Sequence, residues 1–268
     1  MNDAQPLAAT STAQLLFACR DVAIDFSGPQ GVKTVLEGVS FEAGRGEFIS
    51  IVGASGTGKT TLLRILAGLS SPRPGSVVEY RGAPVQDPPD GVVFVFQDYR
   101  GSLLPWRTVQ RNVTLGLERS RMDRRERERK AMDALGLVGL ADRAKDHPWR
   151  LSGGMQQRVQ IARALVMQPQ ALLMDEPFGA LDAMTKASLQ DEVLRLHEVT
   201  HTTVLFVTHD IEEAVYLSDR VIVLSESPAR ITADIRIDLP RPREQVATRE
   251  SPEYLALRHR VYSAMGKA

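Results

Sequence analysis

The chain has 268 residues, 43% of them hydrophobic, so it can bury a sizeable core and is not a disordered tail. Its 33 basic and 33 acidic residues cancel, which argues against a dedicated nucleic-acid binder, because such proteins usually carry a basic excess. A single cysteine, Cys19, excludes an intrachain disulfide and is typical of a reducing compartment. No apolar run approaches the ~18 residues that span a bilayer, and the N-terminus lacks the basic segment of a signal peptide. We therefore expect a cytoplasmic protein whose membrane role, if it has one, comes through partners.

Two kinds of strand pattern follow along the chain. Val22, Ile24 and Phe26 alternate with polar residues, as in a half-buried strand, and a turn at residues 27–31 leads to a second such strand. Farther on, five short apolar runs suit parallel strands that are buried on both faces and joined by helices. These runs cover residues 48–52, 92–96, 171–174, 204–207 and 221–224. The sequence predicts an α/β fold with a mainly parallel sheet and an N-terminal antiparallel β subdomain.

Mainly helical signals fill the long segment between the strand that ends at Phe96 and the strand that starts at Ala171. This segment is too long for a single crossover connection, so we expect an inserted α-helical subdomain at about residues 98–168. Within it, residues 119–130 hold seven basic and three acidic side chains. Their spacing favours Asp123–Arg127 and Glu126–Lys130 pairs on a solvated helix face, and contact with lipid headgroups or a partner is the alternative.

The C-terminal part shows one more strand and one more helix. Apolar residues alternate from Ile231 to Leu239, as in a strand that Pro240 ends. Ser251 followed by Pro252 has the pattern of a helix N-cap with proline at the first helical position. The expected organisation is one domain over residues 15–245 and a short helical tail over residues 246–268.

Residues 53–60 match the pattern G-x-x-x-x-G-K-[ST], with an expected buried strand before them and a helix-compatible stretch after them. The glycines let the backbone curl so that successive N–H groups face one anion, and the helix adds its positive end. We expect Lys59 to reach the β- and γ-phosphates and the Thr60 hydroxyl to bind Mg²⁺. The motif predicts a nucleotide site. Its residues are Gly53, Ala54, Ser55, Gly56, Thr57, Gly58, Lys59, Thr60 and Thr61.

Two carboxylates, Asp175 and Glu176, stand at the carboxyl end of the expected strand 171–174. Ligands of open parallel sheets gather at this edge. We expect Asp175 to hold Mg²⁺ through its water shell, and Glu176 to orient or deprotonate an attacking water. Without the phosphate loop, such a pair would more often be the start of a solvated loop.

A second glycine-containing loop, Leu-Ser-Gly-Gly-Met at residues 151–155, opens another helix. It again offers free N–H groups and a hydroxyl, that of Ser152, to an anion, and a simple helix cap is the alternative. Because one phosphate chain needs only one such cradle, the second suggests that another copy of the protein supplies it.

These motifs, in this order, resemble those of the ATPase subunit of an ATP-binding cassette (ABC) transporter, from about Leu15 to about Leu224. The resemblance rests on the phosphate loop, on the signature LSGGMQQR at residues 151–158 and on the acidic pair. Gln97 at a strand end, the stretch GALD at residues 179–182 and His209 complete the set. The resemblance implies a P-loop NTPase core of the RecA-like type, ATP and Mg²⁺ as cofactors, and ATP hydrolysis coupled to transport.

The same resemblance implies a homodimer with ATP held between two protomers. One protomer would contribute Lys59, Thr60, Gln97, Asp175, Glu176 and His209, and the other Ser152, Gly153 and Gly154. Glu176 is then the general base, His209 contacts the γ-phosphate, and Gln97 touches Mg²⁺ or water. Asp182 communicates across the dimer. Phe26 stands where the family places an aromatic that stacks on adenine, and an ordinary strand residue is the alternative.

Stretches at residues 97–106, 175–185 and 224–228 resemble ATPases of nitrate, sulfonate and taurine importers. This implies permease subunits in the membrane, an external substrate-binding protein, no nucleic acid, and a peripheral location at the cytoplasmic face of the inner membrane. The alternative is an ABC-type ATPase that acts on nucleic acid or ribosomes. A single cassette, the lack of sustained heptads and the single cysteine oppose it.

Overall fold

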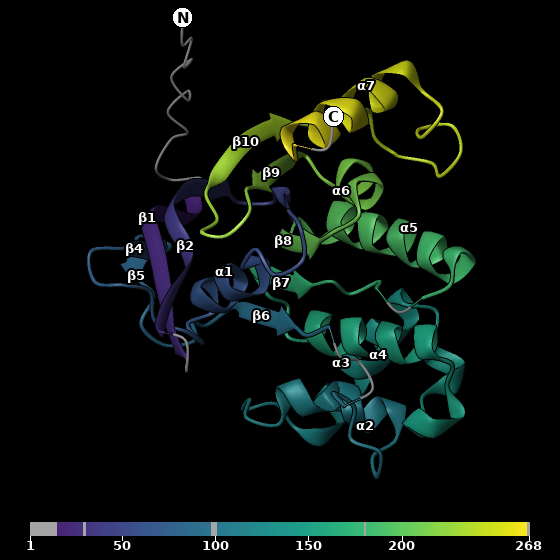
Figure 1. Cartoon of the computed structure of the whole chain (residues 1–268). Helices are drawn as coiled ribbons and strands as arrows, with labels where there is room; N and C mark the ends of the chain where they lie inside the picture. The colour runs from purple at the N-terminus through teal and green to yellow at the C-terminus, as the bar shows by residue number, and fades with distance from the viewer. Residues whose placement is uncertain (1–14, 29–30, 98–100, 180, 267–268) are drawn as a thin grey trace, which may run out of the picture.

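The computed structural model describes residues 15–28, 31–97, 101–179 and 181–266. Its central layer is a six-stranded sheet in the order β10-β9-β3-β8-β7-β6 (Figure 1). Neighbouring strands run parallel, except that the edge strand β10 is antiparallel to β9. The strands are β3 (Phe48–Val52), β6 (Val92–Val95), β7 (Ala171–Asp175), β8 (Thr203–Thr208), β9 (Arg220–Leu224) and β10 (Ile231–Arg236). The sheet confirms the predicted mainly parallel α/β fold.

This sheet separates two hydrophobic cores, because successive side chains of a strand point to opposite faces. In β3, Phe48 and Val52 pack in one core, whereas Ile49 and Ile51 pack in the other. The first core includes residues of α5 (Ala183–Thr200) and α6 (Ile211–Leu217), and the second includes residues of α1 (Lys59–Leu66). With both faces covered, every residue of β3, β7 and β8 is buried, which explains the continuous apolar runs in the sequence.

A second, antiparallel sheet covers the α1 side in the order β2-β1-β4-β5. Strands β1 (Leu15–Gly28) and β2 (Gly31–Gly44) form a long hairpin, and β4 (Val77–Tyr80) and β5 (Ala83–Pro84) extend it. Val22 and Ile24 of β1 are buried in the same core as α1. This sheet is the antiparallel β part predicted near the N-terminus. Cys19 lies buried within it as a free thiol.

Helices fill the segment between β6 and β7, in the lower part of Figure 1. They are α2 (Val109–Val113), α3 (Arg124–Leu137) and α4 (Gly153–Leu165), which contact one another, and short 3-10 helices lie at Thr114–Leu117, Ala141–Arg143 and Pro148–Arg150. The main chain returns from this helical part to the central sheet only at β7. Its limits at residues 98 and 168 stay a prediction, as does the division at residue 245.

The charged stretch at residues 119–130 forms ion pairs other than those expected. Among the described residues, no ion pair joins Asp123 to Arg127 or Glu126 to Lys130. Asp123 is instead the N-cap of α3, where its carboxylate accepts a hydrogen bond from the Glu126 amide at 2.8 Å. The pairs that form are Arg124–Glu128 and Arg129–Asp133, both at 2.8 Å. Capping occupies the Asp123 carboxylate, and Lys130 instead donates to the side-chain oxygen of Gln168 at 3.4 Å, so neither expected pair forms.

The C-terminal segment packs back onto the central sheet. Strand β10 ends at Arg236, earlier than the alternation to Leu239 suggested, although Ile237 and Leu239 are buried. Helix α7 (Pro252–Ala264) begins as predicted: the Ser251 hydroxyl accepts from the Tyr254 amide at 3.2 Å, with proline at the start of the helix. This helix contacts α6, β9 and β10 (Figure 1).

Candidate functional site: a phosphate loop at the carboxyl edge of the sheet

The predicted phosphate loop connects β3 to α1, at the carboxyl edge of the parallel strands. Gly56 and Gly58 have positive φ angles of 79° and 97°, a backbone region that side chains disfavour. At Gly58 a Cβ would also lie 2.7 Å from Val35 of the hairpin. The Thr57 hydroxyl donates to the Ala54 carbonyl at 3.0 Å and closes the loop on itself. The loop is therefore held in a curled conformation by its own residues and by the adjacent sheet.

Lys59 is the first residue of α1, and its side chain crosses the loop. Its Nζ donates to the carbonyl oxygens of Gly53 and Ala54, at 3.0 and 2.9 Å, and the residue is only 5% exposed. Burial lowers the pKa of the Lys59 ammonium, and the nearby carboxylates of Glu176 and Asp175 oppose that shift. The Lys59 ammonium is thus a largely desolvated cation that lies against the carbonyl groups of the loop.

Thr60 and Asp175 bring the phosphate loop and β7 together. The Thr60 hydroxyl donates to a carboxylate oxygen of Asp175 at 2.9 Å. Burial raises the pKa of Asp175, and the hydrogen bond from Thr60 works against this shift. The two residues that the sequence assigned to one metal ion are therefore direct neighbours, although 115 positions separate them in the chain.

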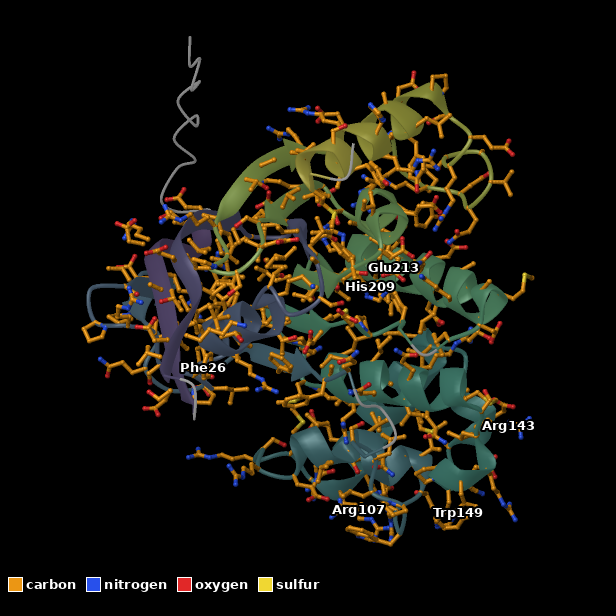
Figure 2. All side chains as sticks on the ribbon, in the orientation of Figure 1. Phe26, Arg107, Arg143, Trp149, His209 and Glu213 are labelled. Atoms are coloured by element: carbon orange, nitrogen blue, oxygen red, sulfur yellow. The ribbon has the colours of Figure 1, made fainter. Side chains whose placement is uncertain are left out.

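Glu176 lies between two of the other predicted residues. Its Oε2 is 3.1 Å from Nδ1 of His209, which follows β8, and 3.4 Å from Nε2 of Gln97, which follows β6. The Glu176 backbone has a φ of 42°, in the left-handed region, and its amide donates to the Val207 carbonyl at 3.0 Å. An unfavourable backbone angle that neighbouring β8 holds in place is a common property of functional sites. Figure 2 labels His209 near the middle of the molecule.

The signature loop lies on a separate segment of the structure. Ser152 is the N-cap of α4, and its hydroxyl accepts from the Met155 amide at 3.3 Å. The helix cap that the sequence left open as an alternative is therefore present. Gly153 and Gly154 form the first turn of α4. In the described part of the chain, no hydrogen bond or ion pair links Ser152, Gly153 or Gly154 to the phosphate loop of the same molecule.

Asp182 is the N-cap of α5, where its carboxylate accepts from the Thr185 amide at 3.0 Å. The hydrogen bonds from the Thr185 hydroxyl and amide lower the pKa of Asp182. Its neighbour in the GALD stretch, Ala180, lies outside the described residues.

Phe26 is 49% exposed and lies near the end of the β1–β2 hairpin, where it pairs with Lys33. Figure 2 places it well away from His209 and Glu213. It is neither a core residue nor in contact with the catalytic candidates, so its part in nucleotide binding stays a prediction.

Sequence reasoning missed two residues that join these segments. Thr185 stands against Gly154, because a Cβ added at Gly154 would lie 2.3 Å from the Thr185 methyl carbon. Lys186 pairs with Asp210, at 2.7 Å, and with the buried Glu213, at 2.6 Å, next to His209. The capping pattern from Asp182 to Thr185 was visible in the sequence. The contacts of Thr185 and Lys186 with other segments left no local signal.

The comparisons with known proteins agree with this geometry. The family profile described as ABC transporter matches residues 36–179, more than half of the chain. The chain belongs to the ABC transporter family. This finding and the fold confirm the resemblance seen in the motifs.

Individual relatives within the family include proteins of the nitrate importer class. Nitrate import ATP-binding protein NrtD of Synechococcus elongatus is 42% identical over 254 residues, which cover 94% of this ABC protein and 91% of NrtD. Nitrate import ATP-binding protein NrtC of the same organism is 44% identical over 232 residues, or 85% of this chain and 35% of NrtC. The chain thus spans about a third of NrtC. These names agree with the narrower resemblance to the nitrate importer class.

Among solved structures, the dimeric ATP-binding cassette MJ0796 bound to ADP and Pi, in a post-hydrolysis state, matches with a TM-score of 0.73 and 31% sequence identity. The match covers 84% of this chain and all of the MJ0796 chain. The P-loop NTPase fold expected from the sequence is thereby confirmed.

Proposed function

We propose that this chain is the ATP-binding and ATP-hydrolysing subunit that energises a membrane ABC transporter. The observation that carries the proposal is the grouping at one sheet edge. Thr60 contacts Asp175 beside the phosphate loop, and Glu176 contacts His209 and Gln97 immediately next to them. A phosphate cradle, a site for a hard cation and a residue that orients or deprotonates the attacking water are the recurring parts of P-loop ATP hydrolysis, and all three are present here.

The residues present fit ATP and Mg²⁺. Oxygen ligands are those that Mg²⁺ prefers, and it usually takes only one or two protein carboxylates, with water and phosphate oxygens completing its coordination. Thr60 and Asp175 offer that set. The curled loop and the desolvated Lys59 offer the N–H groups and the cation that a phosphate chain needs. When bound, Mg²⁺ supplies charge neutralisation at the phosphates.

In this proposal Glu176 acts as the general base and accepts a proton from the attacking water. His209, 3.1 Å from the Glu176 carboxylate, orients it and contacts the terminal phosphate. Gln97 donates to the same carboxylate at 3.4 Å and contacts the metal or the water. Thr61 and the loop amides complete the phosphate contacts, and Phe26 stacks on the adenine.

We assign the second cradle, the signature loop of this chain, to the nucleotide of a partner copy. Ser152, Gly153 and Gly154 make no bond to the phosphate loop in the described part of their own chain, which supports a role on the nucleotide of another protomer. The carboxylate of Asp182 is exposed, and we assign it to communication between the two protomers. The solved dimers of MJ0796 support this homodimeric arrangement.

The transporter that we propose is an importer of small anions such as nitrate, sulfonate or taurine. The names of NrtC and NrtD support this class. Its other parts are permease subunits in the membrane and an external substrate-binding protein, with this chain at the cytoplasmic face of the inner membrane. In the described residues, no helix combines the length and apolarity needed to cross a membrane. No nucleic-acid partner is proposed.

The test of the proposed function is Glu176→Gln. The substitution keeps the size of the side chain but removes the proton acceptor, so ATP should still bind while steady-state turnover falls by roughly 10²–10⁴-fold. Turnover is measured as Mg²⁺-dependent phosphate release. Phosphate release close to the wild-type rate would contradict the assignment of Glu176.

Lys59→Ala serves as the contrasting control in the same experiment. Because it removes the cation beneath the loop, it should weaken ATP binding itself, which a fluorescent ATP analogue measures directly. Normal binding by both variants, together with normal turnover, would exclude this edge of the sheet as the ATP site.

A further inference from the structure

Thr185, in the first turn of α5, lies between two segments to which the proposed function gives roles in the partner's site. On one side is the signature loop. A Cβ added at Gly154 would meet the Thr185 methyl carbon at 2.3 Å, whereas the next nearest atoms, at 3.7 and 3.8 Å, are at ordinary contact distances. An alanine at Gly154, the second glycine of the signature, would therefore force either the Thr185 side chain or the signature loop to shift.

On the other side of Thr185 is Asp182. The Asp182 carboxylate accepts a hydrogen bond from the amide of Thr185 at 3.0 Å, and the Thr185 hydroxyl lowers the pKa of that carboxylate. A threonine in a helix has few χ1 rotamers, so the direction of its hydroxyl fixes the direction of its methyl group. In the rotamer that the structure shows, the methyl group of Thr185 points toward Gly154, and this leaves the hydroxyl to face Asp182.

The contact between Thr185 and Gly154 is not the main packing contact between α4 and α5. Further along α4 and α5, Arg158 donates to Ser188 at 3.0 Å and pairs with Glu192 at 3.5 Å. The α4–α5 interface continues into the first core, in which Val159 and Leu189 are fully buried. Removing the methyl group of Thr185 should therefore leave the fold intact and change only the register of the signature loop against α5.

We propose that Thr185 is a positioning residue that holds the signature loop and Asp182 in one fixed arrangement for the nucleotide of a partner copy. The inference rests on the proposed function, because it assigns Thr185 to that reaction. Its two branches have separate tasks: the hydroxyl sets Asp182, and the methyl group sets Gly154. Thr185 itself touches no nucleotide in this proposal.

The decisive experiment is a rescue. Gly154→Ala introduces the clash and should lower kcat by roughly 10²-fold, the cost of misplacing a site by about 1 Å. Thr185→Ser removes the methyl group but keeps the hydroxyl that binds Asp182. The double variant Gly154→Ala/Thr185→Ser should therefore recover most of kcat, a coupling that independent sites do not show. Binding of a fluorescent ATP analogue to the monomer should be unchanged in all three.

Two further variants sharpen the readout. Thr185→Val keeps the methyl group but loses the hydroxyl, so it should reduce ATP-dependent dimerisation when combined with Glu176→Gln. Ser188→Ala, one turn farther along α5, is the matched control and should leave kcat and dimerisation unchanged. All variants should melt close to the wild-type temperature, because α4 and α5 keep their shared core.

The outcomes separate the inference from the function on which it rests. An active wild type with a double variant as slow as Gly154→Ala would overturn the role of Thr185 and leave the proposed function standing. A wild type without Mg²⁺-dependent ATPase activity would overturn the proposed function. Rescue by Thr185→Ser, with unchanged nucleotide binding, is the result expected.

Discussion

Burial and neighbouring charges shift the pKa values of individual side chains beside the phosphate loop. Burial lowers the pKa of Lys59 and raises the pKa of Asp175, and the two opposite charges partly offset both effects. Removing either charge takes away part of what offsets the burial of the other. At the residue scale the site is therefore a coupled unit.

Another buried ionisable residue, His197 of α5, packs against Phe48 at the amino end of β3, whereas the phosphate loop follows the other end of that strand. Its Nε2 bonds to the Gly46 carbonyl at 3.0 Å, and because a carbonyl oxygen only accepts, Nε2 carries the proton. Nδ1 is buried and has no hydrogen-bond partner among the described residues. Burial lowers the pKa of His197; Asp219 and Glu198 oppose the shift, whereas Arg241 adds to it.

This environment predicts a pH dependence of stability. The folded protein binds the His197 proton less tightly than the unfolded chain, whose histidine pKa is about 6.5. The stability that His197 contributes to the folded state is therefore fully present above a pH of about 6.5. It is lost as the pH falls through the lowered pKa of His197 in the folded protein. Urea unfolding between pH 8 and pH 5 should show the loss.

The variant His197→Gln keeps a donor for Gly46 but does not titrate, so the loss between pH 8 and pH 5 should be smaller in that variant. His259→Gln, at an exposed position on α7, is the control and should follow the wild type. A pH profile of His197→Gln that matches the wild-type profile would exclude His197 as the source.

At the scale of elements, α7 is joined to the helix that follows His209. Glu212 in the first turn of α6 pairs with Arg249 at 3.2 Å and with Arg258 at 3.1 Å. Tyr254, only 1% exposed, donates from its hydroxyl to the Glu212 carbonyl at 3.2 Å. The ion pairs are partly exposed and contribute little, so the buried tyrosine is the main anchor.

Tyr254→Ala should therefore detach α7. Removing a buried aromatic side chain costs roughly 3–5 kcal/mol, and here the loss falls on the docking of one terminal helix. Hydrogen exchange should rise in residues 252–264 while β3, β7 and β8 stay protected. Tyr262→Ala, 43% exposed on the same helix, is the matched control. Uniform loss of protection across the whole protein would show that α7 is part of one cooperative unit with the sheet.

At the scale of the whole molecule, the site that we propose joins the phosphate loop of one copy to the signature loop of another, so the complete site needs two copies. With hydrolysis blocked by Glu176→Gln, ATP should accumulate the dimer, which size-exclusion chromatography detects. Adding Ser152→Arg should return the protein to the monomer, because a bulky cation replaces the hydroxyl at the second cradle.

The control for this dimerisation experiment is Ser263→Arg in the Glu176→Gln background. It adds the same charge at an exposed position of α7 and should leave the ATP-dependent dimer intact. If the Ser152→Arg variant still dimerised with ATP, the arrangement of one nucleotide between two protomers would be wrong.

The sequence by itself determined the parts of this protein that depend on local pattern. Buried parallel strands need continuous apolar runs, so β3 and β7 were predicted nearly to the residue. The phosphate loop needs glycines, a lysine and a hydroxyl at fixed spacing, which is also local. The cap of α7, which was predicted, follows the same rule, because an N-cap bonds within its own first turn; the cap of α5 was not predicted, although it has the same local form.

Only the tertiary structure decided which segments meet. Thr185 contacts Gly154, Lys186 pairs with Asp210, and Tyr254 reaches the Glu212 carbonyl, yet none of these partners has a fixed sequence spacing. Packing of whole helices sets such contacts, and the same spacing in another fold would place the side chains apart. Burial also depends on the assembled cores, which is why the pKa shifts of Lys59, Asp175 and His197 could not be derived from the sequence.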